Sequence, residues 1–431
     1  MLSELVRNMI HIGRLTVQVG DDTPFTVGAV PAETPELDIA IRLKGRGTAA
    51  RLALDPEYQL GQTYMDGELE VESGTLAGFM SLIGHNLGRK PTPGALAWAR
   101  DLIARISTMT NSLARARRNV EHHYDLSESF YRLFLDTDLQ YSCAYFAEPG
   151  MSLQAAQVAK KAHIAAKLDL QPGAKILDIG CGWGGLAISL ARLADVQVTG
   201  ITLSSEQLRV ARARADVEGL ADRVHFELAD YRMLEGRFDR IVSVGMFEHV
   251  GKDHFDDYFG AINRLLDDTG VALVHSIGRK DHGAGLDRWM NRYIFPGGYV
   301  PAASEAIAAL EKTGLWLADV EILRLHYAET LRHWRQRVEA NRARVEALYD
   351  ERFYRMWIYY LASCEMGFRF YGLMVVQMQI TRQIDELPTT RGYMAECEKR
   401  YLEILCPSEP DRSQGAHRRS PNVKITPELR D

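Results

Sequence analysis

Ala174-Lys-Ile-Leu-Asp-Ile-Gly-Cys-Gly-Trp-Gly-Gly185 is the stretch of the chain that decides its fold. A short apolar run ends at Ile179 and turns into a glycine-rich loop, and an apolar helical segment, 186–193, follows at once. That order of strand, tight turn and helix is typical of a nucleotide-binding crossover unit. Gly180 and Gly182 can adopt backbone angles closed to other residues and let a ligand approach the main chain. The stretch therefore predicts a Rossmann-like α/β fold.

The glycine spacing alone also fits a dinucleotide-binding fingerprint, so the next strand must separate the alternatives. A dehydrogenase of this pattern needs an acidic residue at the end of that strand, or an arginine for a 2′-phosphate. The strand 196–202 instead runs into Leu203-Ser-Ser-Glu-Gln207, with neither residue at the expected place. Asp178 precedes the first glycine by two positions, and this Asp-x-Gly-x-Gly-x-Gly run resembles the S-adenosylmethionine (SAM) loop of Rossmann-like methyltransferases. Other nucleotide ligands stay open at this point.

Composition narrows the class of protein further. A chain of 431 residues predicts two domains, and 46% hydrophobic with 25% charged residues is typical of a soluble globular protein. A net charge of -6 argues against general nucleic-acid binding. The five cysteines are scattered without a CxxC pair, which favours a reduced cytoplasmic setting and indicates no metal site. We find neither a signal-peptide core nor an apolar run of the roughly 18 residues that a membrane span needs.

The chain divides into four predicted parts. A small N-terminal α+β domain, 1–105, is expected to handle lipid, and a basic connector, 106–120, leads to the catalytic domain, 121–405. The tail, 406–431, is polar and is expected to be disordered. The arginine-rich stretch before and within the connector is either a solvated helix or a contact for anionic phospholipid headgroups, where each basic residue adds about 1 kcal/mol.

Three further strands are expected at 224–230, 238–248 and 270–275. Ligands in open α/β sheets bind at the carboxyl ends of parallel strands, so polar residues at those ends should converge on one crevice. Each of them alone could instead be a helix cap or a satisfied polar residue. The residues at these ends are Asp178, Thr202, Asp230, Glu248 and His275.

Two aromatic segments leave alternatives open. The segment 287–301 predicts either a lid or tunnel wall for an apolar substrate, or a packed insertion. The segment 352–380 is apolar over most of its length and predicts one long helix, mainly packed in the core.

Taken in order, several further runs resemble the cyclopropane-fatty-acyl-phospholipid synthase family, which includes the mycolic acid cyclopropane synthases. The likeness covers about 120–405, and Tyr64-Met-Asp-Gly-Glu-Leu69 extends it into the N-terminal domain. The matching runs include His123-Tyr-Asp-Leu126, Tyr141-Ser-Cys-Ala-Tyr-Phe146, Val198-Thr-Gly-Ile-Thr-Leu-Ser204, Phe238-Asp-Arg-Ile-Val-Ser-Val-Gly-Met-Phe-Glu-His-Val-Gly251, Tyr293-Ile-Phe-Pro-Gly-Gly298 and Arg355-Met-Trp-Ile-Tyr-Tyr-Leu361.

The resemblance implies the chemistry and its residues. SAM would donate a methyl group to a cis double bond of a phospholipid acyl chain, and the resulting carbocation would lose a proton to a base, a bound bicarbonate ion, as the ring closes. The residues implied for SAM are Tyr141, Ser142, Asp178, Gly180, Gly182, Gly184, Thr202, Gln207, Tyr231 and Arg232. The residues implied for the base pocket are Cys143, Glu248, His275 and Tyr327, with backbone from the loop at Ile277 and with Cys364 as a further active-site position.

Alternatives to cyclopropane formation follow from the same likeness. The chain could give a methyl- or methylene-bearing acyl chain, act on another lipid acceptor, or be a non-catalytic lipid-binding relative. The run Gly-Gly-Tyr at 297–299 departs from the family pattern and leaves the choice of acyl chain open. The expected setting is the cytoplasmic face of the membrane, with phospholipid and no nucleic acid as partner, and assembly as a homodimer is compatible with this interpretation.

Overall fold

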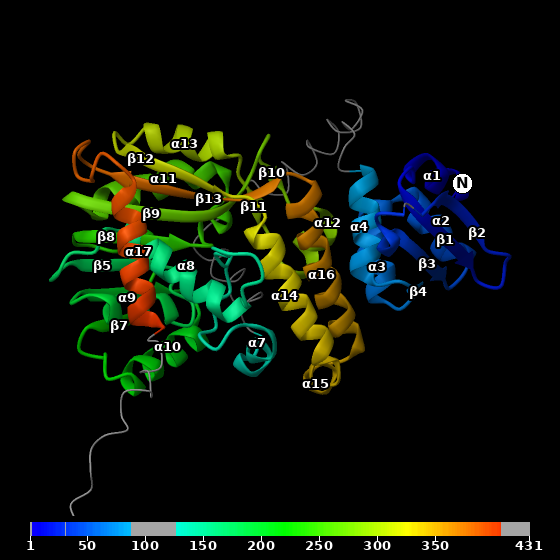
Figure 1. Ribbon diagram of the computed structural model, residues 1–431, viewed down its shortest axis with the longest axis horizontal. Helices are drawn as coiled ribbons and strands as arrows, with labels where there is room; N and C mark the ends of the chain where they lie inside the picture. The colour runs from blue at the N-terminus through cyan, green and yellow to red at the C-terminus, as the bar shows by residue number, and fades with distance from the viewer. Residues whose placement is uncertain (1, 31, 88–125, 407–431) are drawn as a thin grey trace, which may run out of the picture.

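The computed structural model describes residues 2–30, 32–87 and 126–406 (Figure 1). The predicted basic connector and the tail beyond Cys406 lie outside these residues. The larger part of the molecule is a seven-stranded sheet in the order β12-β13-β9-β8-β5-β6-β7, in which β13 alone runs antiparallel to its neighbours. Its strands are β5 (Lys175–Ile179), β6 (Gln197–Thr202), β7 (Val224–Leu228), β8 (Phe238–Val244), β9 (Leu266–Arg279), β12 (Trp316–Leu323) and β13 (Leu373–Thr381).

Apolar side chains alternate to the two faces of this sheet and form a core on each. Ile176 of β5 packs with the helices on one face, and the next residue, Leu177, packs with those on the other. This period of two is the geometry of a strand buried on both faces. The first face carries α8 (Leu153–Lys167), α9 (Gly185–Leu193), α10 (Ser205–Val217) and α17 (Gly392–Leu405), and the second carries α11 (Phe255–Leu265) and α13 (Ala303–Glu311) (Figure 1).

The prediction of one long helix over 352–380 is wrong. Helix α16 (Glu351–Phe370) ends before Gly372, whose φ of 74° is open mainly to glycine, and β13 begins at Leu373. β13 lies between two other strands and is buried on both faces, so its polar residues Gln377, Gln379 and Thr381 are buried like the apolar residues between them. This alternation has the period of two that indicates a strand, but the first residues of β13, Leu373 to Val376, continue the apolar run of α16 and favour one helix.

The N-terminal part forms a second, four-stranded sheet in the order β2-β1-β3-β4. Helix α3 ends in a turn at Asp66-Gly67, where Gly67 has a φ of 69°. The strands are β1 (Gly13–Val19), β2 (Phe25–Ala29), β3 (Asp38–Leu43) and β4 (Leu69–Ser73), and the helices are α1 (Leu2–Met9), α2 (Arg46–Leu54), α3 (Pro56–Met65) and α4 (Leu76–Leu87). We call residues 2–87 the N-terminal unit.

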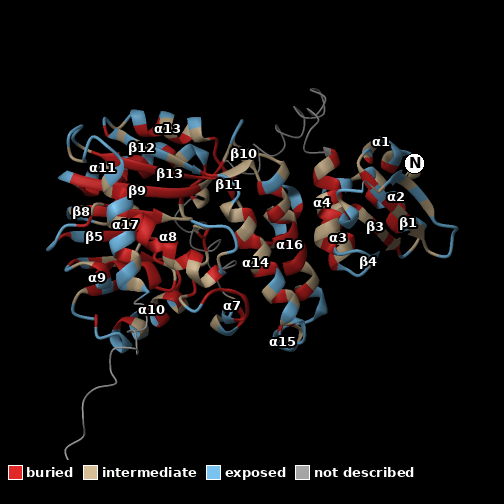
Figure 2. Cartoon of the chain, in the orientation of Figure 1, coloured by how far each residue is buried: buried red, intermediate tan, exposed pale blue. Residues whose placement is uncertain are grey.

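The N-terminal unit packs on α16 through a continuous apolar core. A single cluster of buried side chains joins Leu82 of α4 to Trp357 of α16 and to Phe134 of α7 (Glu128–Phe134). Figure 2 shows buried residues in α3, α4 and α16, where the two parts of the molecule meet. The division of the chain near residue 105 stays a prediction, since that position lies outside the described residues.

The remaining elements are short or lie between the sheet and the N-terminal unit. They are α12 (Arg288–Tyr293), α14 (His326–Ala340), α15 (Arg342–Leu348), β10 (Ala284–Gly285) and β11 (Tyr299–Val300). Within the described ranges, no helix combines the length and the apolarity needed to cross a bilayer.

Candidate active site

A pocket opens at the carboxyl ends of β5, β6 and β8. All of the residues predicted for SAM line it except Gly184, which caps α9 behind the loop and faces the ring of Phe226. Asp230 lines the pocket as well, so three of the strand-end residues share the expected crevice. The predicted residues in the lining are Tyr141, Ser142, Asp178, Gly180, Gly182, Thr202, Gln207, Tyr231 and Arg232.

The glycine loop is held in its bent form by backbone hydrogen bonds to the next strand. The amides of Gly180 and Cys181 both donate to the carbonyl of Ile201, at 3.0 and 2.9 Å. Gly180 has a φ of 80° and Gly182 one of 55°, angles that side-chain-bearing residues rarely adopt. The loop can therefore present its main chain to a ligand in the pocket.

Asp178 offers the pocket an unsatisfied acceptor. Its Oδ2 is buried and has no hydrogen-bond partner among the described residues. Burial raises the pKa of this carboxyl to about 7, against the opposing charge of Lys160. Leaving such an oxygen unpaired is costly unless a ligand supplies a donor or positive charge. SAM carries both in its ammonium and sulfonium groups, so the site fits it.

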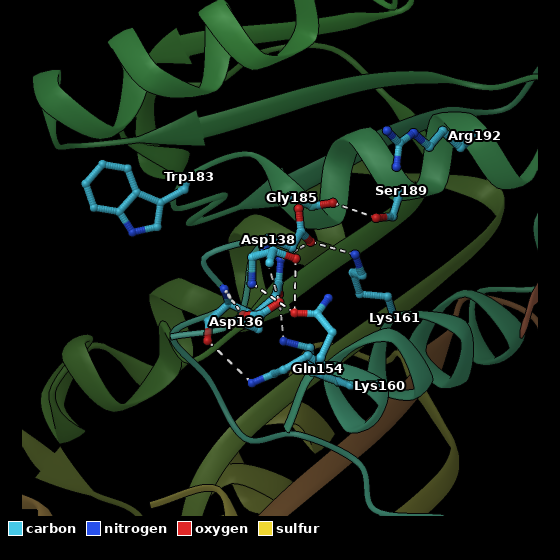
Figure 3. A network of polar contacts seen from close by, with 12 residues as sticks. Asp136, Asp138, Gln154, Lys160, Lys161, Trp183, Gly185, Ser189 and Arg192 are labelled. Carbon is cyan, nitrogen blue, oxygen red and sulfur yellow. Dashed lines mark hydrogen bonds and ion pairs between the residues drawn. The ribbon is translucent and has the colours of Figure 1, made fainter. Parts of the chain in front are cut away.

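A buried lysine holds the loop that forms one wall of the pocket. Lys160 of α8 is fully buried, and its Nζ donates to Gln140 Oε1 at 2.6 Å and to Ser142 Oγ at 2.8 Å. The next residue, Lys161, pairs with Asp138 at 2.6 Å, and Figure 3 shows both lysines reaching from α8 toward this loop. Burial lowers the pKa of Lys160 to about 8. The wall that carries Ser142 is thus fixed to α8 before any ligand binds.

Two side-chain pairs shape the opposite wall. Thr202 Oγ1 donates to Gln207 Oε1 at 2.8 Å, so these two pocket-lining residues hold each other in place. Arg232 forms an ion pair with Asp230 at 2.7 Å and lies 5.7 Å from the centroid of the Tyr231 ring. Burial raises the pKa of the Tyr231 phenol. This wall combines an aromatic face with polar groups that already have partners.

Three of the residues predicted for the base pocket adjoin lining residues, by chain neighbourhood or by a hydrogen bond. Cys143 follows Ser142 in the chain, and Glu248 lies in a short 3-10 helix, Phe247–His249, that begins beside the pocket. The carbonyl of His275 accepts a hydrogen bond from the pocket residue Gly245 at 2.9 Å. None of the three belongs to the pocket lining itself.

The electrostatics of these three groups suit an enclosed site. Burial raises the pKa of the Glu248 carboxyl, although hydrogen bonds from Ser276 at 2.8 Å and from the amide of Ile277 at 3.4 Å oppose that shift. Burial also raises the pKa of the Cys143 thiol and lowers that of His275 well below its usual value. All three groups are therefore biased toward their uncharged forms.

Tyr327 and Cys364 are also absent from the pocket lining. Tyr327 is on α14, with its ring 4.8 Å from that of Phe368, and Cys364 is a half-buried residue of α16. A hydrogen bond between the hydroxyls of Tyr360 and Tyr141, at 3.0 Å, joins α16 to the pocket. The structure therefore connects α16 to the SAM side through Tyr360, and Cys364 does not reach the lining.

Sequence reasoning missed several residues of the lining. His249 lines the pocket, and burial lowers its pKa to about 4; it stands at a strand end beside Glu248, and its position could have identified it. Trp183 and Met246 also contribute and carried no signal of their own. Within the aromatic segment 287–301, residues 296–298 line the pocket and Trp289 packs against the N-terminal unit, while a lid or tunnel wall for an apolar substrate stays a prediction.

A mostly parallel seven-stranded sheet, a glycine loop after its central strand and a pocket at the strand ends define a Rossmann-like, SAM-dependent methyltransferase. The family model of mycolic acid cyclopropane synthetase matches residues 111–378. The chain is 37% identical to the cyclopropane-fatty-acyl-phospholipid synthase of Escherichia coli K12, covering 83% of this chain and 90% of that protein. It belongs to the mycolic acid cyclopropane synthetase family.

Two other relatives are similar to this chain. A protein described as a probable fatty acid methyltransferase of Pseudomonas putida is 38% identical, over 82% of this chain and 88% of its own length. The crystal structure of mycolic acid cyclopropane synthase CmaA1, complexed with SAH and CTAB, superposes with a TM-score of 0.58 at 35% identity, over 62% of this chain and 98% of that chain.

Proposed function

We propose that this enzyme transfers a methylene group from SAM to the cis double bond of an unsaturated phospholipid acyl chain and so forms a cyclopropane fatty acid. The observation that carries the proposal is the arrangement of one pocket with the predicted SAM residues in its lining and with Cys143, Glu248 and His275 adjoining that lining. The Escherichia coli relative is named a cyclopropane-fatty-acyl-phospholipid synthase, and this chain matches it over most of its length.

The reaction needs an alkene, a methyl donor and a base. The alkene electron pair attacks the SAM methyl carbon while the carbon–sulfur bond breaks, and its electrons stay on sulfur. The new bond leaves a cation on the second alkene carbon. Removal of a proton from the added methyl group supplies the electron pair that closes the ring. Water would capture the cation, so the reacting atoms must be enclosed.

The residues that adjoin the pocket lining suit an anionic base. A bicarbonate ion held there would supply the base for this proton. Groups that keep their protons can donate to such an ion, and the raised pKa of Glu248 and of Cys143 keeps both protonated to higher pH than usual. The amide of Ile277 adds a main-chain donor next to Glu248. In this proposal Tyr327 is the fourth residue of the base pocket.

A second product is favoured by one observation. A relative described as a fatty acid methyltransferase is as similar to this chain as the synthase is. If the cation loses a proton of the acyl chain instead, an alkene stays beside a methyl branch. A hydride shift within the chain, followed by proton loss from the added methyl group, gives a methylene branch, and a saturated methyl branch needs a hydride donor as a further substrate. The two outcomes share SAM and the lipid and differ only in how the cation is resolved.

Lipid mass spectrometry tests the proposal. Purified protein is incubated with SAM and liposomes of a cis-monounsaturated phospholipid, and the acyl chains are analysed by mass and by proton NMR. A gain of one CH₂ with loss of the alkene signal and appearance of cyclopropyl protons supports the synthase. The same gain with the alkene retained supports the methyltransferase, and a branched saturated chain would instead show a gain of CH₄, because reduction of the cation adds a hydride.

Two further arms test the base and the enzyme class. His275→Gln should abolish turnover while the exposed control His225→Gln should not, and depletion of dissolved CO₂ should slow a reaction that added bicarbonate restores. Turnover that ignores bicarbonate contradicts the proposed base. A protein that fails to bind SAM in a calorimetric titration is a lipid-binding relative without activity.

The proposal includes the setting of the reaction. The protein acts at the cytoplasmic face of the membrane as a peripheral protein, its N-terminal unit helps to handle lipid, and a homodimer is compatible with both. Co-sedimentation with anionic and with zwitterionic liposomes tests the membrane contact.

A further inference from the structure

We propose that Gln377 is a positioning residue that fixes the side chain of His275 in the tautomer with its proton on Nε2. The residue lies in the middle of β13, directly opposite His275 in the register between β13 and β9. Both side chains are buried, and Gln377 Nε2 lies 3.0 Å from His275 Nδ1. The meaning of this contact depends on which end of the amide faces the ring.

Lys167 decides the orientation of the amide. Its Nζ lies 2.6 Å from Gln377 Oε1 and forms an ion pair with Glu321. An ammonium group has three donors and no acceptor, so it can bond only the oxygen end of the amide. The NH₂ end of Gln377 must then face His275.

A donor facing Nδ1 decides the state of the ring. The Gln377 NH₂ group has no lone pair to offer, so Nδ1 of His275 must accept, and it cannot carry a proton. A neutral imidazole with an accepting Nδ1 carries its proton on Nε2. The hydrogen bond to Gln377 thus selects one of the two His275 tautomers, just as the partner of one ring nitrogen fixes the tautomer of a metal-binding histidine.

The charge of Lys167 depends on a buried chain of contacts: burial lowers the pKa of the lysine, and its hydrogen bond and ion pair with Glu321 oppose that shift. Burial opposes the charge of Glu321, but hydrogen bonds from His163 and Lys167 lower the pKa of this carboxyl to about 2, so it stays ionised beside the lysine. His163 lies 2.8 Å from Glu321 and 3.0 Å from Glu398 of α17. The amide is therefore oriented by a network that extends from the centre of the sheet to α17.

The electrostatic surroundings of His275 also favour a neutral ring. Besides burial, the charges of Lys160, Lys167 and His163 on α8 lower the pKa of His275, and Glu321 of β12 opposes them weakly. On the other side, Glu248 bonds the neighbouring Ser276. These groups favour a neutral His275 ring whose one N–H donor is at Nε2. Its use in the base pocket rests on the function proposed above.

Nitrogen-15 NMR of the full chain labelled at histidine tests the tautomer without substrate. The His275→Gln protein identifies the resonances by their absence. In the wild type we expect a protonated Nε2 and an accepting Nδ1 for His275. A wild-type ring with its proton on Nδ1 overturns the proposal, whatever the activity of the protein.

Variants separate positioning from general stability. In Gln377→Glu the carboxylate can only accept, so the proton should move to Nδ1; in Gln377→Met the ring should populate both tautomers. Gln379→Met is the matched control, since Gln379 is a buried amide two residues along the same strand that bonds the Lys167 carbonyl and Tyr393 instead. It should leave the His275 resonances unchanged. Identical spectra for wild type, Gln377→Glu and Gln377→Met contradict the proposal.

An activity arm then tests the consequence for catalysis. Gln377→Glu should lower kcat by about 10²-fold with little change in KM for SAM, and its pH–rate profile should shift because the ring becomes easier to protonate. Gln379→Met should keep the wild-type profile. If no protein has activity, wild type included, while the tautomer is as expected, the proposed function fails and the tautomer assignment stands.

Discussion

Asp178 and Lys160 show how burial sets the charge state of single residues at this site. Asp178 has an unpaired oxygen in the pocket, and Lys160 lies beneath the pocket wall. Burial raises the pKa of Asp178 to about 7, against the charge of Lys160. Burial lowers the pKa of Lys160 to about 8, against the charges of Asp136 and Asp138. Both groups can therefore change protonation near neutral pH when a charged ligand enters.

Binding of SAM should release a proton from Asp178. The cationic groups of SAM favour the carboxylate and lower its pKa from about 7, so below pH 7 the complex holds fewer protons than the free protein. Affinity should then fall by up to about tenfold per pH unit below 7 and level off above it. Isothermal titration calorimetry in buffers of different ionisation enthalpy measures the released proton.

Asp178→Asn should bind SAM more weakly and lose this proton release. Asp230→Asn is the matched control, because it removes a carboxylate from the same pocket and leaves Asp178 in place. A wild-type protein that binds SAM without any exchange of protons between pH 6 and 7 contradicts the assignment.

The buried thiols should not react as nucleophiles in the native protein. Burial raises the pKa of Cys143 and of Cys181, and the thiolate is the reactive form. Cys406 is exposed. Treatment with iodoacetamide at pH 8 should label Cys406 first, as mapped by peptide mass spectrometry, and activity should survive that labelling. Early labelling of Cys143 with loss of activity would point to a reactive thiolate instead.

At the scale of elements, the strands of the sheet could be predicted where glycine and polar residues bound them. The sequence predicts β5 to β8 close to their observed bounds, and it predicts β9 at 270–275, within the longer strand 266–279. Strand β13 was missed because it follows an apolar helix after only two residues and begins with an apolar run, although residues 376–381 alternate as a strand does. Its identity as a strand depends on its pairing with β9 and β12, which are distant in sequence.

The same limit applies to the site. The SAM residues could be predicted because they lie in contiguous motifs at strand ends. Gln377 and Lys167 carry no motif, and they meet only because α8 packs on β13, 210 positions away along the chain. Lys160 would be expected at a helix surface from its charge, yet it is fully buried. The sequence pattern does not determine which elements that are distant along the chain come into contact.

The network between α8, β12 and α17 predicts a dependence of stability on acid. The carboxyl of Glu321 has a pKa of about 2 in the folded protein and an ordinary value of 4.5, because hydrogen bonds from His163 and Lys167 outweigh burial. A lowered carboxyl pKa contributes stability above the unfolded value and loses it as pH falls through the folded value. That contribution should be complete above pH 4.5 and should disappear toward pH 2.

Glu321→Gln should therefore cost about 1.5–3 kcal/mol at neutral pH, the value of charged hydrogen bonds, and almost nothing near pH 2. Urea denaturation followed by circular dichroism across this range measures the difference. Asp195→Asn, at a position 84% exposed, is the control and should follow the wild type. Parallel curves for wild type and Glu321→Gln at every pH would show that the network does not hold the carboxylate.

At the scale of the whole molecule, close helix packing joins the N-terminal unit to α16. A Cβ atom added at Gly61 would lie 2.6 Å from the Tyr359 ring, and one added at Gly84 would overlap the ring of Phe370. Arg352 adds an ion pair with Asp66 at 2.8 Å. The absence of side chains at these two glycines lets the helices approach each other.

Gly84→Ala should destabilise the protein by about 1–3 kcal/mol, because the new methyl group has no room against Phe370. Gly47→Ala is the control: Gly47 lies in α2 with no atom within 4 Å of the added Cβ, and the change should stabilise that helix by about 0.5–1 kcal/mol. Thermal melting monitored by circular dichroism compares the two. Equal melting temperatures would mean that α4 and α16 can separate without cost.

The shared core has a consequence for how this chain could be recombined with its relatives. The family model begins at residue 111, so the N-terminal unit lies outside it, while α16, on which the unit rests, lies within it. A chimera that joins this unit to another family member would expose Leu82 and its neighbours unless the recipient offers the same helix face. The unit can be inherited or exchanged only together with the surface of α16, and the two should change in step as such proteins diverge.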